Sequence, residues 1–293
     1  MYDAEPTTTH AAMASPWLSE SAFVSGLNAV HDRGYVIIEN AMSLEDCRQY
    51  RDELERHMAQ SPRGRNVFEG TSSHRLYALL AKSETFAAMI EHPLALAFAE
   101  HFLGESCLLS ACLSINLHPG ESVQPWHTDD AHIGVAHPHG IFGVSVFWAL
   151  DETTVLNGAT EVLPYSHRWA DSELQGMLQG MLQDEHFTQT ETVGEDSHGA
   201  LDSVYAAMPA GSIMIMRSDV WHRGGANRSE TDRLIVTPQY CAGWARQLEN
   251  MLLAVPAERA RVLPKRTQEL LGYSIHTPFM GYVDGMHPSR VLK

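Results

Sequence analysis

Two histidines and one aspartate are the residues of this sequence best suited to chemistry. His127-Thr128-Asp129 is the only His-x-Asp tripeptide in the chain, and His222 and Arg233 follow it much later. Two imidazoles and one carboxylate are the ligands of the facial triad that holds non-haem Fe(II) and leaves other coordination positions open. A guanidinium such as that of Arg233 can bind a carboxylate through two parallel hydrogen bonds. These residue types predict an oxygenase site for Fe(II) and a dicarboxylic co-substrate, 2-oxoglutarate.

The positions of these residues strengthen a signal that is weak by itself. With 17 histidines in the chain, about one His-x-Asp tripeptide is expected by chance. Here each candidate lies beside a short apolar run of the kind that forms a strand, and such ends gather at the mouth of a β-barrel. His127 follows residues 107–117 and a turn at Pro119-Gly120, His222 follows residues 213–216, and Arg233 precedes residues 234–236. The alternative is two surface histidines and an unrelated arginine.

The composition is that of a folded, acidic protein. The 293 residues are 44% hydrophobic, which is enough for a sizeable core, and no linker-like tract or internal repeat divides them. The formal net charge is 20 − 36 = −16. This sign disfavours nucleic acid and anionic membranes as partners, because both select cationic surfaces. We expect a small-molecule partner, and the sequence leaves the formation of a homo-oligomer open.

The cysteines and the apolar segments bear on location. Cys107 and Cys112 lie in an apolar run and are expected to be core thiols, and no Cys-x-x-Cys spacing occurs, which favours a cytoplasmic protein. No uninterrupted apolar segment reaches about 18 residues, so no transmembrane helix is expected. Residues 1–16 are polar and lack the hydrophobic core of a signal peptide. We expect this N-terminus to be mobile.

The remaining residues, 17–293, are expected to form a single domain with three parts. Residues 17–105 read as helices with one strand at 35–38, residues 106–242 as a β core, and residues 243–293 as an extension with a short helix near 244–253. Short apolar runs separated by Gly, Pro, Asn and Asp turns are typical of a sandwich or barrel. In the core these runs are 108–117, 143–150, 160–163, 211–216 and 233–241. The polar stretch 176–203 predicts an insertion that either closes over bound ligand or faces solvent without a role.

Several short motifs carry a resemblance to a known family. They are Gly34-Tyr35-Val36-Ile37, Gln124-Pro125-Trp126-His127-Thr128-Asp129, Asn157-Gly158-Ala159-Thr160, Pro164-Tyr165-Ser166-His167, and His222 with Arg233. Together they resemble the phytanoyl-CoA dioxygenase-like family of Fe(II)/2-oxoglutarate oxygenases over about residues 34–242. Tyr165 departs from the pattern, because the family usually has glycine there. The resemblance implies a mainly β fold, a double-stranded β-helix (jelly roll, cupin-like) flanked by helices.

The resemblance also implies roles for individual residues. His127, Asp129 and His222 would bind Fe(II) and act in catalysis, and Arg233 would bind the distal carboxylate of 2-oxoglutarate. With O₂ as the other co-substrate, a C–H bond is oxidised while 2-oxoglutarate is decarboxylated to succinate. Related halogenases have a small residue in place of the carboxylate, so Asp129 favours hydroxylation, desaturation, epoxidation or ring formation over halogenation. The further co-substrate contacts implied are Thr160 and Gln124.

Other side chains have two interpretations. Thr160 is equally a β-branched strand residue, and Gln124 a turn-supporting side chain. Tyr77 resembles a pocket-lining position and Trp126 is a second candidate for substrate contact, although Tyr77 also fits a half-buried structural role. The loop that follows Asp129 contains three histidines whose spacing suggests a second metal, but we expect polar surface there. These histidines are His132, His137 and His139.

The predicted substrate is a small molecule, such as a secondary metabolite or a modified amino acid. Two other functions are compatible with the fold. One is a cupin-like metalloenzyme that does not use 2-oxoglutarate, against which Arg233 argues. The other is a catalytically silent jelly-roll binding protein, against which the complete triad argues. The identity of the substrate is not encoded in the motifs, because fold does not fix function.

Overall fold

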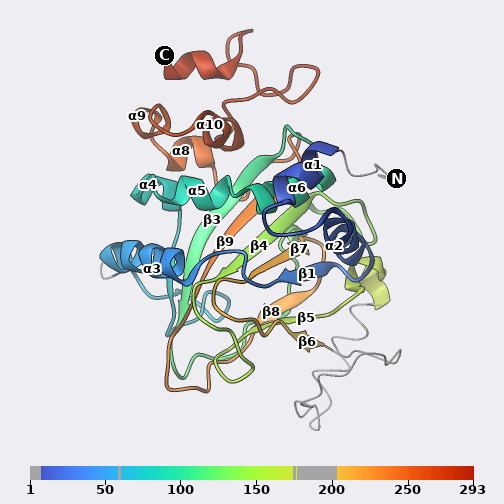
Figure 1. Cartoon of the computed structure of the whole chain (residues 1–293), viewed down its shortest axis with the longest axis vertical. Coiled ribbons are helices and arrows are strands. Elements are labelled where there is room, and N and C mark those ends of the chain that lie inside the picture. Colours follow the sequence, from blue (N-terminus) through green and yellow to red (C-terminus); the bar gives the residue numbers. More distant parts are fainter. Residues whose placement is uncertain (1–7, 59–60, 174–175, 177–202) are drawn as a thin grey trace.

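Two antiparallel β-sheets form the core of the protein (Figure 1). The computed structural model describes residues 8–58, 61–173, 176 and 203–293. The major sheet has the strand order β1-β7-β4-β9-β3-β2, and the minor sheet has the order β6-β5-β8. The strands are β1 (Tyr35–Ile38), β2 (His74–Leu76), β3 (Leu108–Leu117), β4 (Gly143–Ala149), β5 (Thr160–Val162), β6 (Val204–Tyr205), β7 (Ile213–Arg217), β8 (His222–Gly224) and β9 (Arg233–Cys241). This is the expected jelly-roll core.

Helices lie outside the two sheets (Figure 1). Ser43 caps the N-terminus of the third helix by accepting a hydrogen bond from the Asp46 backbone N–H at 3.0 Å, as its sequence predicts. Within the described ranges, no helix is long and apolar enough to cross a membrane. The helices are α1 (Thr8–Ala14), α2 (Glu20–Asp32), α3 (Leu44–Met58), α4 (Leu79–Lys82), α5 (Phe86–Ile90), α6 (Pro93–Leu103), α8 (Met251–Ala254), α9 (Ala257–Ala260) and α10 (Lys265–Leu271), with 3₁₀ turns η1 (Ala131–Ile133), η2 (Ser166–Arg168) and η3 (Pro288–Leu292).

The two ends of the chain differ from expectation. Residues 8–14 are not a mobile tail: they form α1, which packs against α6 and buries Ala14 completely. The C-terminal helix begins at Met251 rather than near residue 244, because the preceding backbone is bonded to β3 instead. There the N–H groups of Leu248 and Glu249 donate to the hydroxyl and the carbonyl of Ser110. The insertion expected at 176–203 falls almost entirely outside the described residues, so its gating role stays a prediction.

Alternation along β3 and β9 divides the major sheet into two faces. Leu234, Val236 and Tyr240 of β9 belong to the apolar core beneath the helices, together with Cys112 of β3. The intervening residues of both strands face the space between the two sheets. Because successive side chains of a strand point to opposite faces, one strand serves both a packed core and an internal cavity. A second apolar cluster, which includes Phe147, fills the other part of the space between the sheets.

Tyr165, where the resemblance leads us to expect glycine, occupies a backbone conformation that favours glycine. Its φ is +66°, in the left-handed region that costs an ordinary L-residue roughly 1–2 kcal/mol. The Arg168 guanidinium lies 5.7 Å from the centre of the Tyr165 ring. The Tyr165 N–H donates to the Arg33 carbonyl at 3.0 Å, so the turn remains attached to the end of α2.

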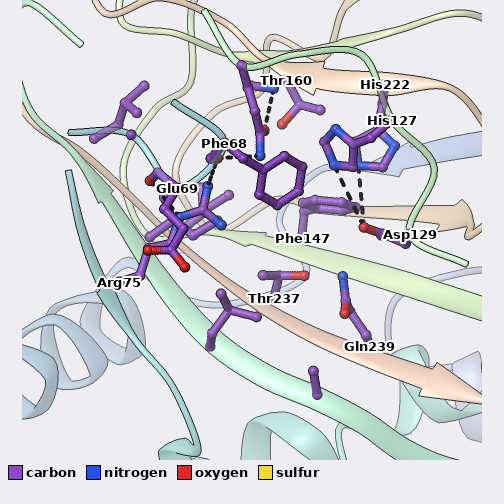
Figure 2. Close-up of a pocket in the computed structure, with 18 of the residues that line it drawn as sticks. Phe68, Glu69, Arg75, His127, Asp129, Phe147, Thr160, His222, Thr237 and Gln239 are labelled. Atoms are coloured by element: carbon purple, nitrogen blue, oxygen red, sulfur yellow. Dashed lines mark hydrogen bonds and ion pairs between the residues drawn. The ribbon is translucent and has the colours of Figure 1, made fainter. Parts of the chain in front are cut away.

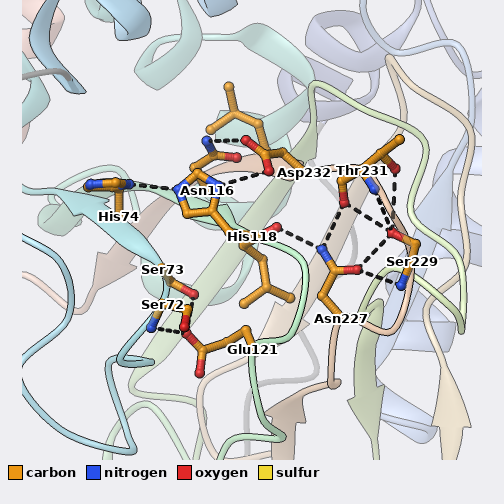
Figure 3. A network of polar contacts seen from close by, with 12 residues as sticks. Ser72, Ser73, His74, Asn116, His118, Glu121, Asn227, Ser229, Thr231 and Asp232 are labelled. Atoms are coloured by element: carbon orange, nitrogen blue, oxygen red, sulfur yellow. Dashed lines mark hydrogen bonds and ion pairs between the residues drawn. The ribbon is translucent and has the colours of Figure 1, made fainter.

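A polar network fixes the turn that leads into β9 (Figure 3). The Asn227 amide donates to the carbonyls of Leu117 and Thr231, both at 2.9 Å, and its oxygen accepts from the N–H and hydroxyl of Ser229. Asn227 is almost fully buried. One residue before Arg233, the Asp232 carboxylate accepts from the Asn116 amide at 3.1 Å. The start of β9 is therefore held on the end of β3.

Replacing Asn227 with Ala should lower the free energy of unfolding by about 1–3 kcal/mol, because it leaves buried carbonyl and N–H groups without partners. Chemical denaturation followed by circular dichroism measures the change. Glu230→Ala is the matched control, since Glu230 is exposed in the same turn and its loss should stay within about 0.5 kcal/mol. Equal stability of the Asn227→Ala protein and the unmodified protein would show that the network does not hold the turn.

Candidate functional site

The backbones of His127 and His222 are paired directly across the end of the minor sheet. Each N–H donates to the other residue's carbonyl at 3.0 Å, which forms an isolated antiparallel bridge. Residues directly opposite in an antiparallel pair have their side chains on the same face. The two imidazole centres are accordingly 4.3 Å apart. Two segments almost one hundred positions apart in sequence thus present two nitrogen donors at one point.

Both imidazoles are oriented by the same local contact. The Nδ1 of His127 lies 3.0 Å from the Pro125 carbonyl, and the Nδ1 of His222 lies 3.0 Å from the Val220 carbonyl. Because a carbonyl only accepts, each Nδ1 carries the hydrogen and each Nε2 keeps its lone pair. Burial and the neighbouring His222 lower the pKa of His127 to about 4, so this ring is neutral at pH 7. Neutral imidazoles oriented through Nδ1 are typical metal ligands.

Asp129 completes the group with one carboxylate oxygen. Its Oδ1 lies 3.7 Å from His222 Nε2 and 4.0 Å from His127 Nε2. Its Oδ2 accepts a short hydrogen bond from the hydroxyl of Ser145 on β4. One donor atom from each of the three residues lies within 4.8 Å of the others. The structure therefore brings the three predicted ligands together as a donor set that fits a divalent metal ion.

Arg233 is buried in the cavity wall without a compensating anion. Its Nη2 donates to the Gly158 carbonyl at 2.6 Å, while its Nε is buried without a hydrogen-bond partner. Burial and the nearby Arg75 lower its pKa to about 10, so it remains charged at pH 7. In the described part of the chain no carboxylate forms an ion pair with it. A buried, unpaired guanidinium is costly, and a bound carboxylate would satisfy it.

The backbone at Gly158 must approach its neighbours closely to receive Arg233. A Cβ at this position would lie 2.4 Å from a methyl carbon of Leu117 and 2.7 Å from the Gly225 carbonyl oxygen, and its φ is +85°. Only glycine fits without displacement. Asn157 supports the same turn by accepting a hydrogen bond from the Thr154 N–H at 2.7 Å. Asn157-Gly158 is thus a structural turn, as its sequence predicts, whose carbonyl orients Arg233.

A cavity of about 520 Å³ connects the three metal-ligand candidates with Arg233. This volume is typical of sites for small molecules. Opposed residues of β3 and β9 form much of one wall: Leu117 faces Arg233, Ile115 faces Ile235, Leu113 faces Thr237, and Ala111 faces Gln239. Figure 2 shows His127, His222 and Asp129 at one side of this space and Arg75 with Glu69 at the other. Most of the remaining wall is hydrocarbon.

The loop between α3 and β2, together with Arg75 of β2 itself, contributes residues that the sequence did not reveal. The Phe68 ring lies against His127, with centres 4.8 Å apart, and it stands between the histidines and Arg75 in Figure 2. Arg75 donates to the backbone carbonyls of Glu69 at 2.8 Å and Phe68 at 3.1 Å, and burial lowers its pKa. Glu121 fixes this loop to the rim, because its carboxylate accepts from the Ser72 N–H at 2.7 Å. Nothing periodic in the loop sequence indicates these contacts.

The other predicted residues fall into two groups. Thr160 and Tyr77 line the cavity, and Thr160 is buried while Tyr77 is partly exposed. Gln124 also lines the cavity, but its amide oxygen accepts from the Gly224 N–H at 3.0 Å and its amide nitrogen donates to the Phe68 carbonyl at 2.9 Å. The ring of Trp126 is not part of the cavity wall; it lies under the Arg223 guanidinium, 4.5 Å from its carbon. The substrate and co-substrate roles of these residues stay predictions.

The histidine loop after Asp129 is not simply polar surface. The His132 ring lines the cavity, and its Nδ1 lies 3.2 Å from the Asp129 carbonyl. The side chains of His137 and His139 are only 9% and 6% exposed and turn inward toward Asp130. The expectation of a solvated loop is therefore wrong for these two residues, because neighbouring carboxylates and Phe142 give their rings buried contacts.

Comparison with known proteins agrees with this geometry. Residues 30–235 match the family model described as phytanoyl-CoA dioxygenase (PhyH). The match spans more than half of the chain, and the protein therefore belongs to the phytanoyl-CoA dioxygenase family. The resemblance expected from the sequence motifs is confirmed.

Several curated fungal proteins are similar over most of the chain. Dioxygenase af480 of Aspergillus fumigatus is 27% identical over 259 residues, which cover 86% of this chain and 76% of that protein. Dioxygenase cnsJ of Penicillium expansum is 26% identical over 294 residues, which cover 91% of this chain and 81% of that protein. Both proteins are named as dioxygenases.

Solved structures of low sequence identity share the fold. The non-haem α-ketoglutarate-dependent epimerase SnoN from nogalamycin biosynthesis has a TM-score of 0.59 at 19% identity, covering 76% of this chain and 83% of its own. The carbocyclase SnoK from the same biosynthesis has a TM-score of 0.57 at 16% identity, covering 82% and 87%. A further SnoN structure contains Fe³⁺, α-ketoglutarate and nogalamycin RO. These likenesses confirm the predicted double-stranded β-helix.

Ser145 is a positioning residue for Asp129, and its loss should weaken metal binding. Ser145→Ala removes the hydrogen bond to Asp129 Oδ2, and loss of such a contact to a ligand typically costs 10–100-fold in metal affinity. Anaerobic calorimetric titration with Fe(II) measures the dissociation constant. The matched control is Ser114→Ala, because Ser114 is also buried on a strand of the major sheet but its hydroxyl has no partner among the described residues. Equal Fe(II) affinities for the two variants would remove Ser145 from this role.

Proposed function

We propose that the protein is an Fe(II)/2-oxoglutarate-dependent oxygenase that oxidises an unactivated C–H bond of a small molecule. The observation that carries this proposal is the pairing of two unlike binding groups in one cavity. One is the nitrogen and oxygen donor set of His127, Asp129 and His222, and the other is the buried, unpaired guanidinium of Arg233. A metal ion satisfies the first group and a carboxylate satisfies the second. Family membership and the ligands of the SnoN complex support the same pair.

Different residues of the cavity would bind the metal ion and the co-substrate. His127, Asp129 and His222 would hold Fe(II), and Arg233 would bind the distal carboxylate of 2-oxoglutarate, with the Thr160 hydroxyl nearby on β5. When bound, iron with 2-oxoglutarate and O₂ supplies the oxidation of a C–H bond, and 2-oxoglutarate is converted to succinate and CO₂. The Gly158 carbonyl accepts from Arg233 Nη2, and the Nε–H without a partner stays available to a carboxylate. Apolar walls limit the access of water, which strengthens these charged contacts.

The cavity also favours a class of substrate. Its walls offer mainly hydrocarbon, and Phe68 lies over the edge of the metal-ligand candidates. A largely apolar small molecule fits this space, with Thr237 and Gln239 available for hydrogen bonds to a polar group. Because Asp129 supplies a carboxylate to the metal, hydroxylation or a related oxygenase outcome is proposed rather than halogenation. Ring formation and epimerisation belong to the same range, since the neighbours SnoK and SnoN are a carbocyclase and an epimerase.

The proposed activity can be tested by following succinate. The purified protein, supplied with Fe(II), ascorbate, O₂ and 2-oxoglutarate, is screened against a library of small, mainly apolar metabolites. Succinate should form in proportion to an oxidised product for at least one compound, and His222→Ala should form neither. Absence of succinate with every compound, even though Fe(II) is bound, would favour the metalloenzyme that does not use 2-oxoglutarate or the silent binding protein.

Arg233→Ala should raise the KM for 2-oxoglutarate strongly, because a carboxylate loses a bidentate charged partner. The loss of such a contact costs roughly 2–5 kcal/mol, or about thirty- to several-thousand-fold. Arg233→Lys should restore part of the affinity, since an ammonium cannot reproduce the planar fork of a guanidinium. Steady-state kinetics at varied 2-oxoglutarate provide the measurement. Arg168→Ala, which removes an arginine half exposed on the surface, is the control. An unchanged KM in Arg233→Ala would contradict the assignment.

A further inference from the structure

A second group of metal-binding side chains lies immediately beside the first. Asp130 follows Asp129 in the chain, and its side chain faces His137 and His139 rather than the cavity. One donor atom of each of the three residues lies within 4.8 Å of the others, as is also true of His127, Asp129 and His222. None of the three lines the cavity described above.

The two imidazoles present bare nitrogen atoms to this group. His139 Nδ1 lies 2.7 Å from the Gly140 carbonyl, so this nitrogen donates and Nε2 keeps its lone pair. His139 Nε2 lies 3.9 Å from Asp130 Oδ2. His137 Nδ1 lies 3.0 Å from the Asp171 carboxylate, which leaves Nε2 facing inward, buried and without a hydrogen-bond partner. An oxygen on Nδ1 and a free Nε2 are the arrangement that orients metal-ligating histidines.

The carboxylate of Asp130 is buried and without partners. Asp130 is only 4% exposed, and both of its oxygens lack a hydrogen bond within the described residues. The nearby guanidinium of Arg217 does not compensate it, because Arg217 donates to both oxygens of Asp219 at 2.8 and 2.6 Å. Unsatisfied buried carboxylates are costly, so a native structure that retains one calls for a partner.

The charge around the group fits a divalent cation. The ionised groups that surround it are the carboxylates of Asp130, Asp219 and Asp171 and the guanidinium of Arg217. The buried Asp130, Asp219 and Arg217 together carry an excess of one negative charge, and the half-exposed Asp171 adds a second. Two imidazoles and one carboxylate suit Zn(II), and other divalent first-row metals bind similar sets.

Binding of an ion requires the three donor atoms, which lie within 4.8 Å of one another, to move closer together. Zinc bonds of about 2.0–2.1 Å place tetrahedral donors about 3.3 Å apart, compared with 3.9 Å between His139 Nε2 and Asp130 Oδ2. The ring of Phe142 stacks on His139 with centres 4.7 Å apart and planes 2° from parallel, which limits the rotation of that ligand. Rotation of the His137 ring and of the Asp130 carboxylate would bring the other donor atoms closer to an ion.

We propose that Asp130, His137 and His139 bind a divalent metal ion, with Zn(II) as the best match, at a structural site separate from the catalytic cavity. The site ties the loop after η1 to the end of the segment that carries Asp129. The N–H groups of Asp129 and Asp130 both donate to the Ser218 carbonyl, at 2.9 and 3.3 Å, so the two centres share one short piece of backbone. Metal in the second centre therefore helps to fix Asp129 in the first.

The test isolates the second site by removing the first. Metal-free His127→Ala/His222→Ala protein is dialysed against Co(II) or Zn(II), without 2-oxoglutarate, and the bound metal is measured by elemental analysis and by the visible absorption of Co(II). We expect one equivalent per chain, and a rise in the melting temperature with Zn(II). Adding His139→Ala or the isosteric Asp130→Asn should abolish both effects, while circular dichroism verifies the fold.

The matched control is His31→Ala, because His31 lies 3.2 Å from the Asp32 carboxylate on the exposed surface. It should leave the equivalent of metal intact. If the double variant binds no Co(II) or Zn(II), or binds it equally after Asp130→Asn, the group is an Asp–His cluster without a metal and the proposal is wrong. Because both histidines of the catalytic group are absent from every sample, failure of the proposed oxygenase activity would not produce either result.

Discussion

The reciprocal backbone pairing of His127 with His222 is the constraint on which the centre depends. It fixes both rings on one face through main-chain hydrogen bonds, independently of any metal. Each ring is then turned by the carbonyl two residues before it, Pro125 in one case and Val220 in the other. One local arrangement used twice thus produces two equivalent nitrogen donors. On the major sheet, the Ser145 hydroxyl sets the direction of the Asp129 carboxylate.

Opposite charges are held apart across an apolar space. The carboxylate of Asp129 lies with the two imidazoles, whereas Arg233 extends from the wall formed by β3 and β9. In a medium of low dielectric constant such charges interact over longer distances than in water, and each prefers a ligand of opposite charge. Under the proposed function, a metal ion and a dicarboxylate together would satisfy both ends. The cavity walls need only supply shape for the third component, the substrate.

The sequence was most informative about candidate site residues that lie at the ends of strands. The boundaries of β1, β3 and β9 follow from apolar runs and flanking turns, and the positions of His222 and Arg233 follow from those boundaries. Thr237 and Gln239 alternate along β9 with the apolar Leu234, Val236 and Tyr240. This pattern in the sequence indicates that the two polar side chains lie on the face opposite the apolar core.

Other parts of the site depend on contacts between segments distant in sequence. Phe68 and the start of β2, which carries Arg75, reach the cavity because Glu121 binds the backbone of the loop between α3 and β2, and no periodicity within that loop encodes this. The inward turn of His137 and His139 likewise depends on Asp171 and Asp130, which lie in different segments. The fold and the gathering of His127, Asp129 and His222 into one group were accordingly predictable, whereas the far wall of the cavity was not.

The strand order has a consequence for how the chain folds during its synthesis on the ribosome. β1 pairs only with β7, and β3 pairs with β9, so early strands wait for partners made much later. At about 5–20 residues per second, the interval between the synthesis of Leu117 and of Arg233 is roughly 6–23 s. Throughout that time the edge of β3 that β9 later covers stays open, because β2 pairs with the other edge. The nascent chain is therefore prone to aggregation during this interval. The cavity can form only after β9, the last strand, has been made.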